Sequence, residues 1–108
     1  MSDGAVALGM IEPEDCQSMT EVRAGIDALD REIVDLLAIR FRFMTAAARI
    51  KQDRGAVRDE WRKAQVIANA KAAAASLGVP AEVVGDIWER LVEGSIAYEF
   101  DRWDDHRA

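Results

Sequence analysis

The chain has 108 residues, a length that suits one small domain and leaves no room for a second, cofactor-binding lobe. Its 14 Lys and Arg residues stand against 20 Asp and Glu residues, and the net charge of -6 argues against nucleic-acid or membrane-surface partners. The single cysteine, Cys16, excludes an intrachain disulfide and a cysteine-rich zinc site. Because the start has no secretory signal pattern and no apolar run is long enough to span a membrane, we expect a cytoplasmic protein.

The first residues carry no hydrophobic periodicity, so we interpret residues 1–14 as a flexible N-terminal tail before a helical domain over residues 15–108. Hydrophobic residues make up 50% of the chain, with 2 Pro and 7 Gly, a balance that favours long helices. The first helix is expected to begin near Ser18 or Thr20, because either side chain can cap it.

The predicted first helix carries apolar residues at alternating steps of four and three, as a coiled-coil seam does. The seam comprises Val22, Ile26, Leu29, Ile33, Leu36, position 40, Phe43, Ala47 and Ile50. Gly55 is well placed as a C-terminal cap, which gives a helix of roughly 35 residues and about 50 Å. A chain this small cannot cover so long a seam, so we expect a second copy to pack against it.

Two further helices are expected. The second follows a loop over residues 52–58, is capped by Asp59, and ends before Gly78. Pro80 suits the first turn of the third helix, and residues 101–107 are interpreted as solvated surface. One broad face of the third helix carries Val84, Ile87, Trp88, Leu91, Ser95, Tyr98 and Trp103. The predicted fold class is therefore all-α, a three-helix chain with a long first helix.

Polar side chains at seam positions indicate a binding site for an anion. Arg40 occupies the seam where a bundle would place leucine, and Lys51 follows on nearly the same face, roughly 16 Å along the axis. Arg23 lies about 25 Å from Arg40, too far for one small metabolite unless an antiparallel partner supplies it. On the third helix, Ser95 and Glu99 should point inward. An open alternative is that Arg40 and Glu99 form a buried ion pair that only fixes helix register.

These residues resemble the all-helical chorismate mutase family, including its isochorismate-pyruvate lyase branch. The stretch over residues 13–51 looks like the family's first helix, with Arg23, Arg40 and Lys51 matching its three cationic positions in order and spacing. The resemblance implies an intertwined helical homodimer whose long first helices pair antiparallel. Each pocket would then receive Arg23 from the other protomer.

Two later segments carry the resemblance further. Residues 56–63 resemble the loop and second-helix start, in which an aspartate matching Asp59 and an arginine matching Arg62 contact the substrate. Residues 93–99 resemble the pocket segment of the third helix, with a serine matching Ser95.

The resemblance implies a chorismate mutase, which converts chorismate to prephenate by a Claisen rearrangement that geometry and electrostatics can drive without a cofactor or metal. The two arginines would hold the carboxylates of the small dicarboxylate substrate, and Lys51 would donate to the ether oxygen as negative charge builds there. The implied catalytic residues are Arg40, Lys51 and Glu99, and the implied substrate-binding residues are Arg23, Asp59, Arg62 and Ser95. The enzyme alternative is isochorismate-pyruvate lyase, which would bind isochorismate and form salicylate.

Several positions bear on the choice between these activities. Glu99 stands where many bacterial members have a glutamine that donates to the ether oxygen, and a carboxyl group donates only when protonated, so activity should fall as pH rises. Lys63 stands where the mutase pattern has a glutamate that helps to hold the ring hydroxyl. PEDC at 13–16 is closer to the lyase branch, whereas AVRD at 56–59 and Ser95 are closer to the mutase branch. A third interpretation is a catalytically degenerate helical regulatory module.

Overall fold

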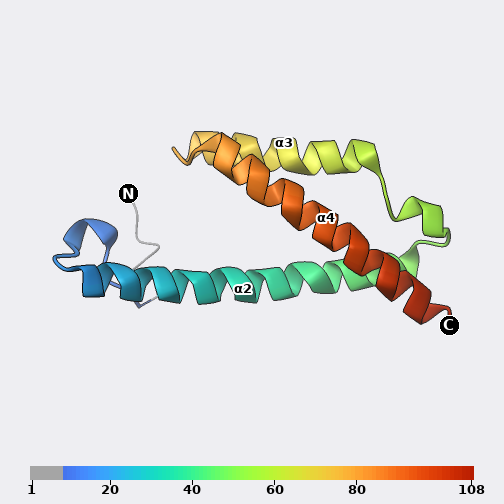
Figure 1. Cartoon of the computed structure of the whole chain (residues 1–108), viewed down its shortest axis with the longest axis horizontal. Helices are drawn as coiled ribbons and strands as arrows, with labels where there is room; N and C mark the ends of the chain where they lie inside the picture. The colour runs from blue at the N-terminus through green and yellow to red at the C-terminus, as the bar shows by residue number, and fades with distance from the viewer. Residues whose placement is uncertain (1–8) are drawn as a thin grey trace. The chain divides into compact units, whose positions relative to one another are not determined.

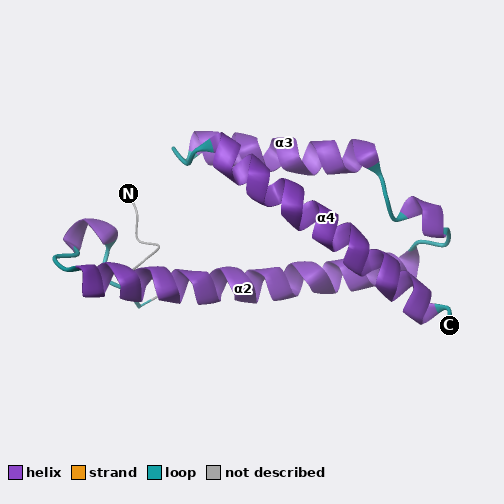
Figure 2. Cartoon of the chain, in the orientation of Figure 1, coloured by secondary structure: helices purple, strands orange, loops and turns teal. Residues whose placement is uncertain are grey.

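The structure of the chain is a computed structural model that describes residues 9–108, and its regular elements in this range are helices without strands (Figures 1 and 2). The α-helices are α2 over Met19–Ile50, α3 over Glu60–Ser76 and α4 over Ala81–His106. Short 3₁₀ turns lie at Pro13–Asp15 and Arg54–Ala56. None of these helices combines the length and the apolar character that crossing a membrane requires. The predicted all-α class with a long first helix is confirmed.

The chain divides into two compact units, the first extending to Arg40 and the second comprising Phe41–Ala108. In the first unit, Ser18 caps α2 by accepting the Glu21 N–H on its Oγ at 3.2 Å. The Glu21 carboxylate in turn accepts the Gln17 N–H at 2.7 Å, an arrangement close to a capping box. The predicted helix start near Ser18 is therefore confirmed.

The segment before α2 contains more local structure than its composition indicates. Residues 13–15 form a 3₁₀ turn, and the Met10 sulfur lies 3.9 Å from the position that a Cβ on Gly25 would take. Met10 and Ile11 also line a cavity of about 140 Å³ beside the first turns of α2. Residues 1–8 lie outside the described part of the chain, and a flexible tail over residues 1–14 stays a prediction.

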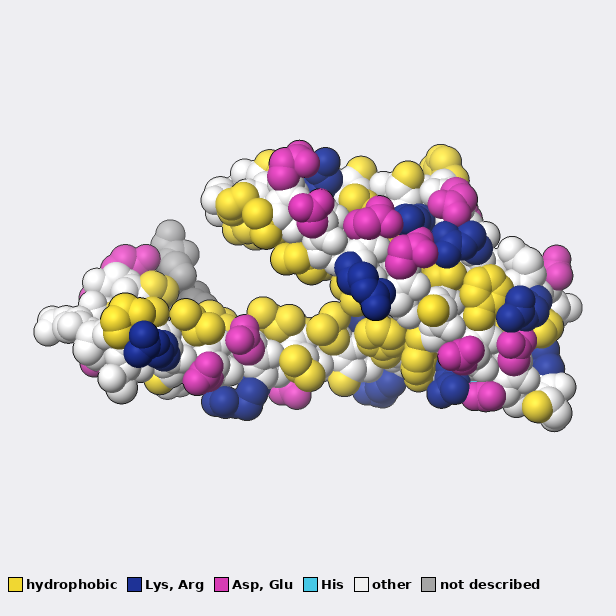
Figure 3. Space-filling model, viewed as in Figure 1, with side chains coloured by type: hydrophobic (Ala, Val, Ile, Leu, Met, Phe, Trp, Pro, Cys, Tyr) yellow, Lys and Arg dark blue, Asp and Glu magenta, His cyan; other side chains and the backbone are white. Residues whose placement is uncertain are grey.

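The apolar seam of α2 is exposed in the single chain, and hydrophobic side chains recur over this helix in Figure 3. Its exposed members are Ile26 (49%), Leu29 (42%), Ile33 (53%), Leu36 (58%), Phe43 (66%) and Ile50 (67%). Single exposed apolar residues are ordinary, but a continuous row of them is typical of a protein interaction surface. The homodimer stays a prediction that this surface favours.

The hydrophobic core of the second unit forms around α4. Val57, Val92 and Ile96 are its buried members. Partly buried residues that pack against them are Val66, Ile67, Trp88, Phe100 and Trp103. The predicted face of the third helix omitted Val92 and Ile96 and included Ile87, which is 52% exposed. The other six predicted residues are buried or partly buried, so the predicted face is confirmed except at Ile87. It was too narrow because α4 packs against both α3 and the end of α2.

The ends of α3 follow local sequence signals. Asp59 accepts the Arg62 N–H on its side chain at 3.0 Å and so caps the start of the helix. After Ser76 the chain turns at Gly78, whose φ of 74° lies in the left-handed region that favours glycine (Figure 1). Both predicted boundaries are confirmed.

The predicted C-terminal cap of the first helix was wrong. The helix ends at Ile50, and Gly55 lies beyond it in the 3₁₀ turn Arg54–Ala56. The physical reason is that Trp103 of α4 and Arg107, the residue directly after α4, donate to the carbonyl groups of Ala48 and Lys51, so the helix end is satisfied several residues before the glycine.

Candidate active site

Buried polar side chains of the second unit meet where the end of α2 lies against α4. Glu99 is 4% exposed, and its Oε2 lies 2.7 Å from Nζ of Lys51. These two atoms form an ion pair, and no further donor to Oε2 is found within the described chain. The Lys51 side chain is 31% exposed, so the carboxylate is enclosed while solvent reaches the cation. A polar ligand can therefore approach a cation and an acidic group that lie side by side.

Ser95 stands one turn before Glu99 on the same buried face of α4. It is 3% exposed, and its hydroxyl donates to the Leu91 carbonyl at 2.7 Å. The inward orientation predicted for Ser95 and Glu99 agrees with this burial. A serine that bonds the carbonyl four residues back is accommodated within the helix.

Two further contacts fix α4 against the end of α2. The hydroxyl groups of Thr45 and Tyr98 lie 3.1 Å apart, within hydrogen-bond distance. The Phe41 ring meets the Tyr98 ring edge to face, with centroids 5.0 Å apart. These contacts hold the helix that carries Glu99 beside the helix end that carries Lys51.

Lys51 is also held through its backbone. Its carbonyl oxygen accepts hydrogen bonds from Trp103 Nε1 at 3.0 Å and from Arg107 Nη2 at 2.6 Å. These contacts were not predicted, because the charged residues of 101–107 indicate solvated surface. A signal was present, since Glu99, Trp103 and Arg107 recur at steps of four and therefore share one face of α4.

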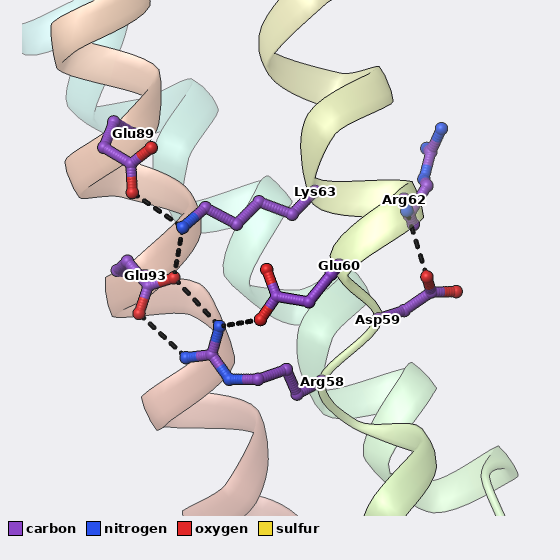
Figure 4. A network of polar contacts seen from close by, with 7 residues as sticks. All are labelled: Arg58, Asp59, Glu60, Arg62, Lys63, Glu89 and Glu93. Carbon is purple, nitrogen blue, oxygen red and sulfur yellow. Dashed lines mark hydrogen bonds and ion pairs between the residues drawn. The ribbon is translucent and has the colours of Figure 1, made fainter.

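The start of α3 is tied to α4 by a cluster of charges (Figure 4). Arg58 donates to both carboxylate oxygens of Glu93, at 3.1 and 2.8 Å, and also to Glu60 at 2.9 Å. The Lys63 ammonium lies 2.7 Å from both Glu89 and Glu93. Hydrogen bonds from Arg58 and then Lys63 lower the pKa of Glu93 to about 2, and hydrogen bonds to Glu89 and Glu93 raise the pKa of Lys63. Both shifts favour the ionised forms of Glu93 and Lys63 at neutral pH.

The predicted site residues of the second unit fall into two groups. Lys51, Ser95 and Glu99 lie together at the corner where α2 ends against α4. Asp59 caps α3, and Figure 4 shows the Arg62 side chain pointing away from the charge cluster. Substrate contact by Asp59 or Arg62 stays a prediction.

The remaining predicted residues, Arg23 and Arg40, lie on α2 in the first unit, where Arg23 is exposed and Arg40 is half-buried. It stays a prediction that Arg23 and Arg40 bind the carboxylates of one substrate together. An ion pair between Arg40 and Glu99 also stays a prediction. Over residues 9–108 the His, Cys, Asp and Glu side chains form no group of three that could hold a metal ion.

The fold and site define an all-helical protein in which a long helix ends at a lysine that faces a buried glutamate on the last helix. The family model described as "Chorismate mutase type II" matches residues 22–100, and the chain belongs to that family. The resemblance seen in the sequence is thereby confirmed.

The relatives of the chain include a lyase and a T-protein. An isochorismate pyruvate lyase of Pseudomonas aeruginosa is 29% identical over 99 residues, which cover 92% of this chain and 98% of that protein. A T-protein of Enterobacter agglomerans is 29% identical over 85 residues, which cover 78% of this chain. The matched region spans only 23% of the T-protein's length.

Proposed function

We propose that the chain catalyses the rearrangement of chorismate to prephenate. The reaction breaks an ether C–O bond and forms a C–C bond within one molecule, so no atom enters or leaves. The observation that carries the proposal is the pair of Lys51 and Glu99, 2.7 Å apart at a corner open to solvent on the lysine side. The Lys51 ammonium is suited to donate to the ether oxygen, which gains negative charge as the bond breaks.

Glu99 would supply the second donor to the same oxygen. An ionised carboxylate only accepts hydrogen bonds, so the working complex requires the protonated carboxyl group. The position of Glu99 supports this role, because its buried carboxyl group lies 2.7 Å from the Lys51 ammonium and the two groups can reach the same ligand atom. Ser95 would line the same pocket one turn away.

The substrate carboxylates would be held by Arg40 and, in an intertwined homodimer, by Arg23 of the second copy. Guanidinium groups match carboxylates geometrically and stay charged at any physiological pH. Because these arginines lie about 25 Å apart along α2, one small ligand can meet both only if two chains contribute. The exposed apolar seam of α2 supports that arrangement. Asp59 and Arg62 are proposed as further substrate contacts.

A second candidate is isochorismate-pyruvate lyase activity, favoured by the match to the Pseudomonas aeruginosa lyase over 98% of that protein. The same cations would hold isochorismate while its ether C–O bond breaks and salicylate and pyruvate form. Family membership supports both reactions, because both act on enol-ether dicarboxylates of the same shape.

Turnover of the purified chain with each substrate tests the proposal. Loss of chorismate absorbance supports the mutase, and growth of salicylate fluorescence from isochorismate supports the lyase. Lys51→Ala should lower kcat roughly 100- to 1,000-fold, as loss of a transition-state donor does. Lys71→Ala is the matched control, since Lys71 lies 3.5 Å from exposed Glu82 on another surface, and it should leave turnover unchanged. Turnover of neither substrate would favour the regulatory module.

The pH profile tests Glu99 separately. Mutase activity should fall as pH rises, because deprotonation removes the carboxyl donor, whereas Glu99→Gln should flatten the profile because an amide donates at every pH. A flat wild-type profile, or the same slope in Glu99→Gln, would remove Glu99 from the mechanism.

A further inference from the structure

Side chains along one face at the end of α4 contact both the ammonium group and the backbone carbonyl of Lys51. Glu99 contacts the ammonium group, while Trp103, one turn later, and Arg107, the residue that caps the end of α4, donate to the backbone carbonyl of the same lysine. Lys51 is the first residue after α2, at the point where the chain enters the turn-rich connection to α3.

The Arg107 guanidinium serves more than one carbonyl. Nη2 donates to the Lys51 oxygen at 2.6 Å, and Nη1 donates to the Ala48 oxygen at 3.0 Å. The guanidinium also stacks over the Trp103 ring, 4.1 Å from its centroid. The two side chains therefore form one rigid unit, and Trp103 anchors it because its ring packs against the hydrophobic core.

A helix C-terminus leaves carbonyl groups without intrahelical donors and carries partial negative charge. An arginine that donates to two of these carbonyls supplies the missing hydrogen bonds and places a positive charge beside the partial negative charge. Helix ends are usually capped by residues that follow in sequence, whereas here the donors come from more than 50 residues later, as the separations of 52 and 56 residues show. The cap therefore fixes the end of α2 to α4 and to the helix that carries Glu99.

The geometry points to Trp103 and Arg107 as positioning residues for Lys51, an inference that rests on the proposed function. The structure restrains Lys51 at both its ammonium group, by Glu99, and its backbone carbonyl, by Trp103 and Arg107, and the flexible stem alone would not fix the ammonium group. Without the two donors, residues after Ile50 can shift relative to Glu99. A displacement of about 1 Å at a reacting group can lower a rate up to 100-fold.

Steady-state kinetics of Trp103→Phe and Arg107→Ala test the inference. Trp103→Phe keeps an aromatic ring in the core and removes only the indole donor. Both variants should lower kcat roughly 10- to 100-fold while KM stays within about twofold. The matched controls are Trp88→Phe, on the same helix and core, and Arg90→Ala, an exposed arginine of α4, and both should keep wild-type kcat.

A double-variant cycle separates positioning from general stability. If Trp103 and Arg107 act through Lys51, each substitution should have no further effect on kcat in a Lys51→Ala background. An equal fold-loss in both backgrounds would overturn the inference.

Amide hydrogen exchange supplies a readout that needs no substrate. Residues 48–53 should exchange faster in Trp103→Phe and Arg107→Ala than in the wild type, while α3 keeps its protection. Unchanged exchange at the end of α2 would overturn the positioning role even if the enzyme is active. A wild type that turns over neither substrate would instead refute the proposed function, and the exchange result would still decide the positioning role.

Discussion

Replacing Lys51 and replacing Glu99 should lower the free energy of unfolding by different amounts, although both changes break the same ion pair. Lys51→Met removes the cation and leaves a carboxylate whose side chain is only 5% exposed. Glu99→Gln removes the negative charge and leaves an ammonium whose side chain is 31% exposed and can be hydrated. Lys51→Met should therefore lower the free energy of unfolding more than Glu99→Gln, because it leaves a charge that water hardly reaches.

The magnitudes can be worked from these exposures. Removing one partner of a fully buried pair costs about 3–5 kcal/mol, and partial access of water to Lys51 reduces this to about 2–4 kcal/mol for Lys51→Met. Glu99→Gln keeps the shape and an oxygen that can accept from Lys51, so we expect a loss of about 1 kcal/mol, the scale of one hydrogen bond. The difference between the variants should be about 2 kcal/mol.

Urea unfolding followed by circular dichroism at pH 7 measures both losses, with all proteins at the same protomer concentration. Lys71→Met controls for the loss of a lysine at an exposed pair and should shift the midpoint little. A Glu99→Gln variant that is destabilised as much as Lys51→Met would refute this reasoning.

Three further predictions concern the core, the charge cluster and the shared pocket. Ile96→Ala, at a position 7% exposed in the core, should lower the free energy of unfolding by about 2–4 kcal/mol in urea titrations with an unchanged m value. Glu93→Gln should lower the melting temperature at neutral pH. Because the pKa of Glu93 is lowered from 4.5 to about 2, the difference from wild type should shrink as pH falls between those values, and a constant difference would contradict the assignment. Inactive Arg23→Ala and Arg40→Ala chains, when mixed and reassembled, should regain about a quarter of wild-type pockets, since half of the dimers are mixed and each has one intact pocket. No recovery after verified exchange would argue against a pocket shared between chains.

Signals that act within a few residues could be predicted from the sequence. Ser18 and Asp59 cap helices because their oxygens reach N–H groups three residues ahead, and Gly78 ends α3 because it adopts a positive φ. These contacts depend only on local spacing. Gly55 carried the same kind of signal as Gly78, yet the fold did not use it, because a cap from α4 had already ended α2.

Contacts across the chain were harder to predict. The inward position of Glu99 follows from its place on an apolar face, and its burial agrees. Its contact with Lys51, and the hold of Trp103 and Arg107 on the same residue, depend on the depth and rotation of α4, which no local pattern encodes. Charged residues such as Lys63 were equally ambiguous, because solvated and clustered charges look the same in a sequence.

The uninterrupted helix α4 that follows the turn at Gly78 limits where this chain can vary in length. From Ala81 onward α4 runs without interruption to His106, so each inserted or deleted residue before Glu99 would rotate everything after it by about 100°. One such change would move Glu99, Trp103 and Arg107 away from Lys51 at the end of α2. Length variants among natural homologues should therefore accumulate in the connection over residues 52–58 and be rare between Pro80 and Glu99.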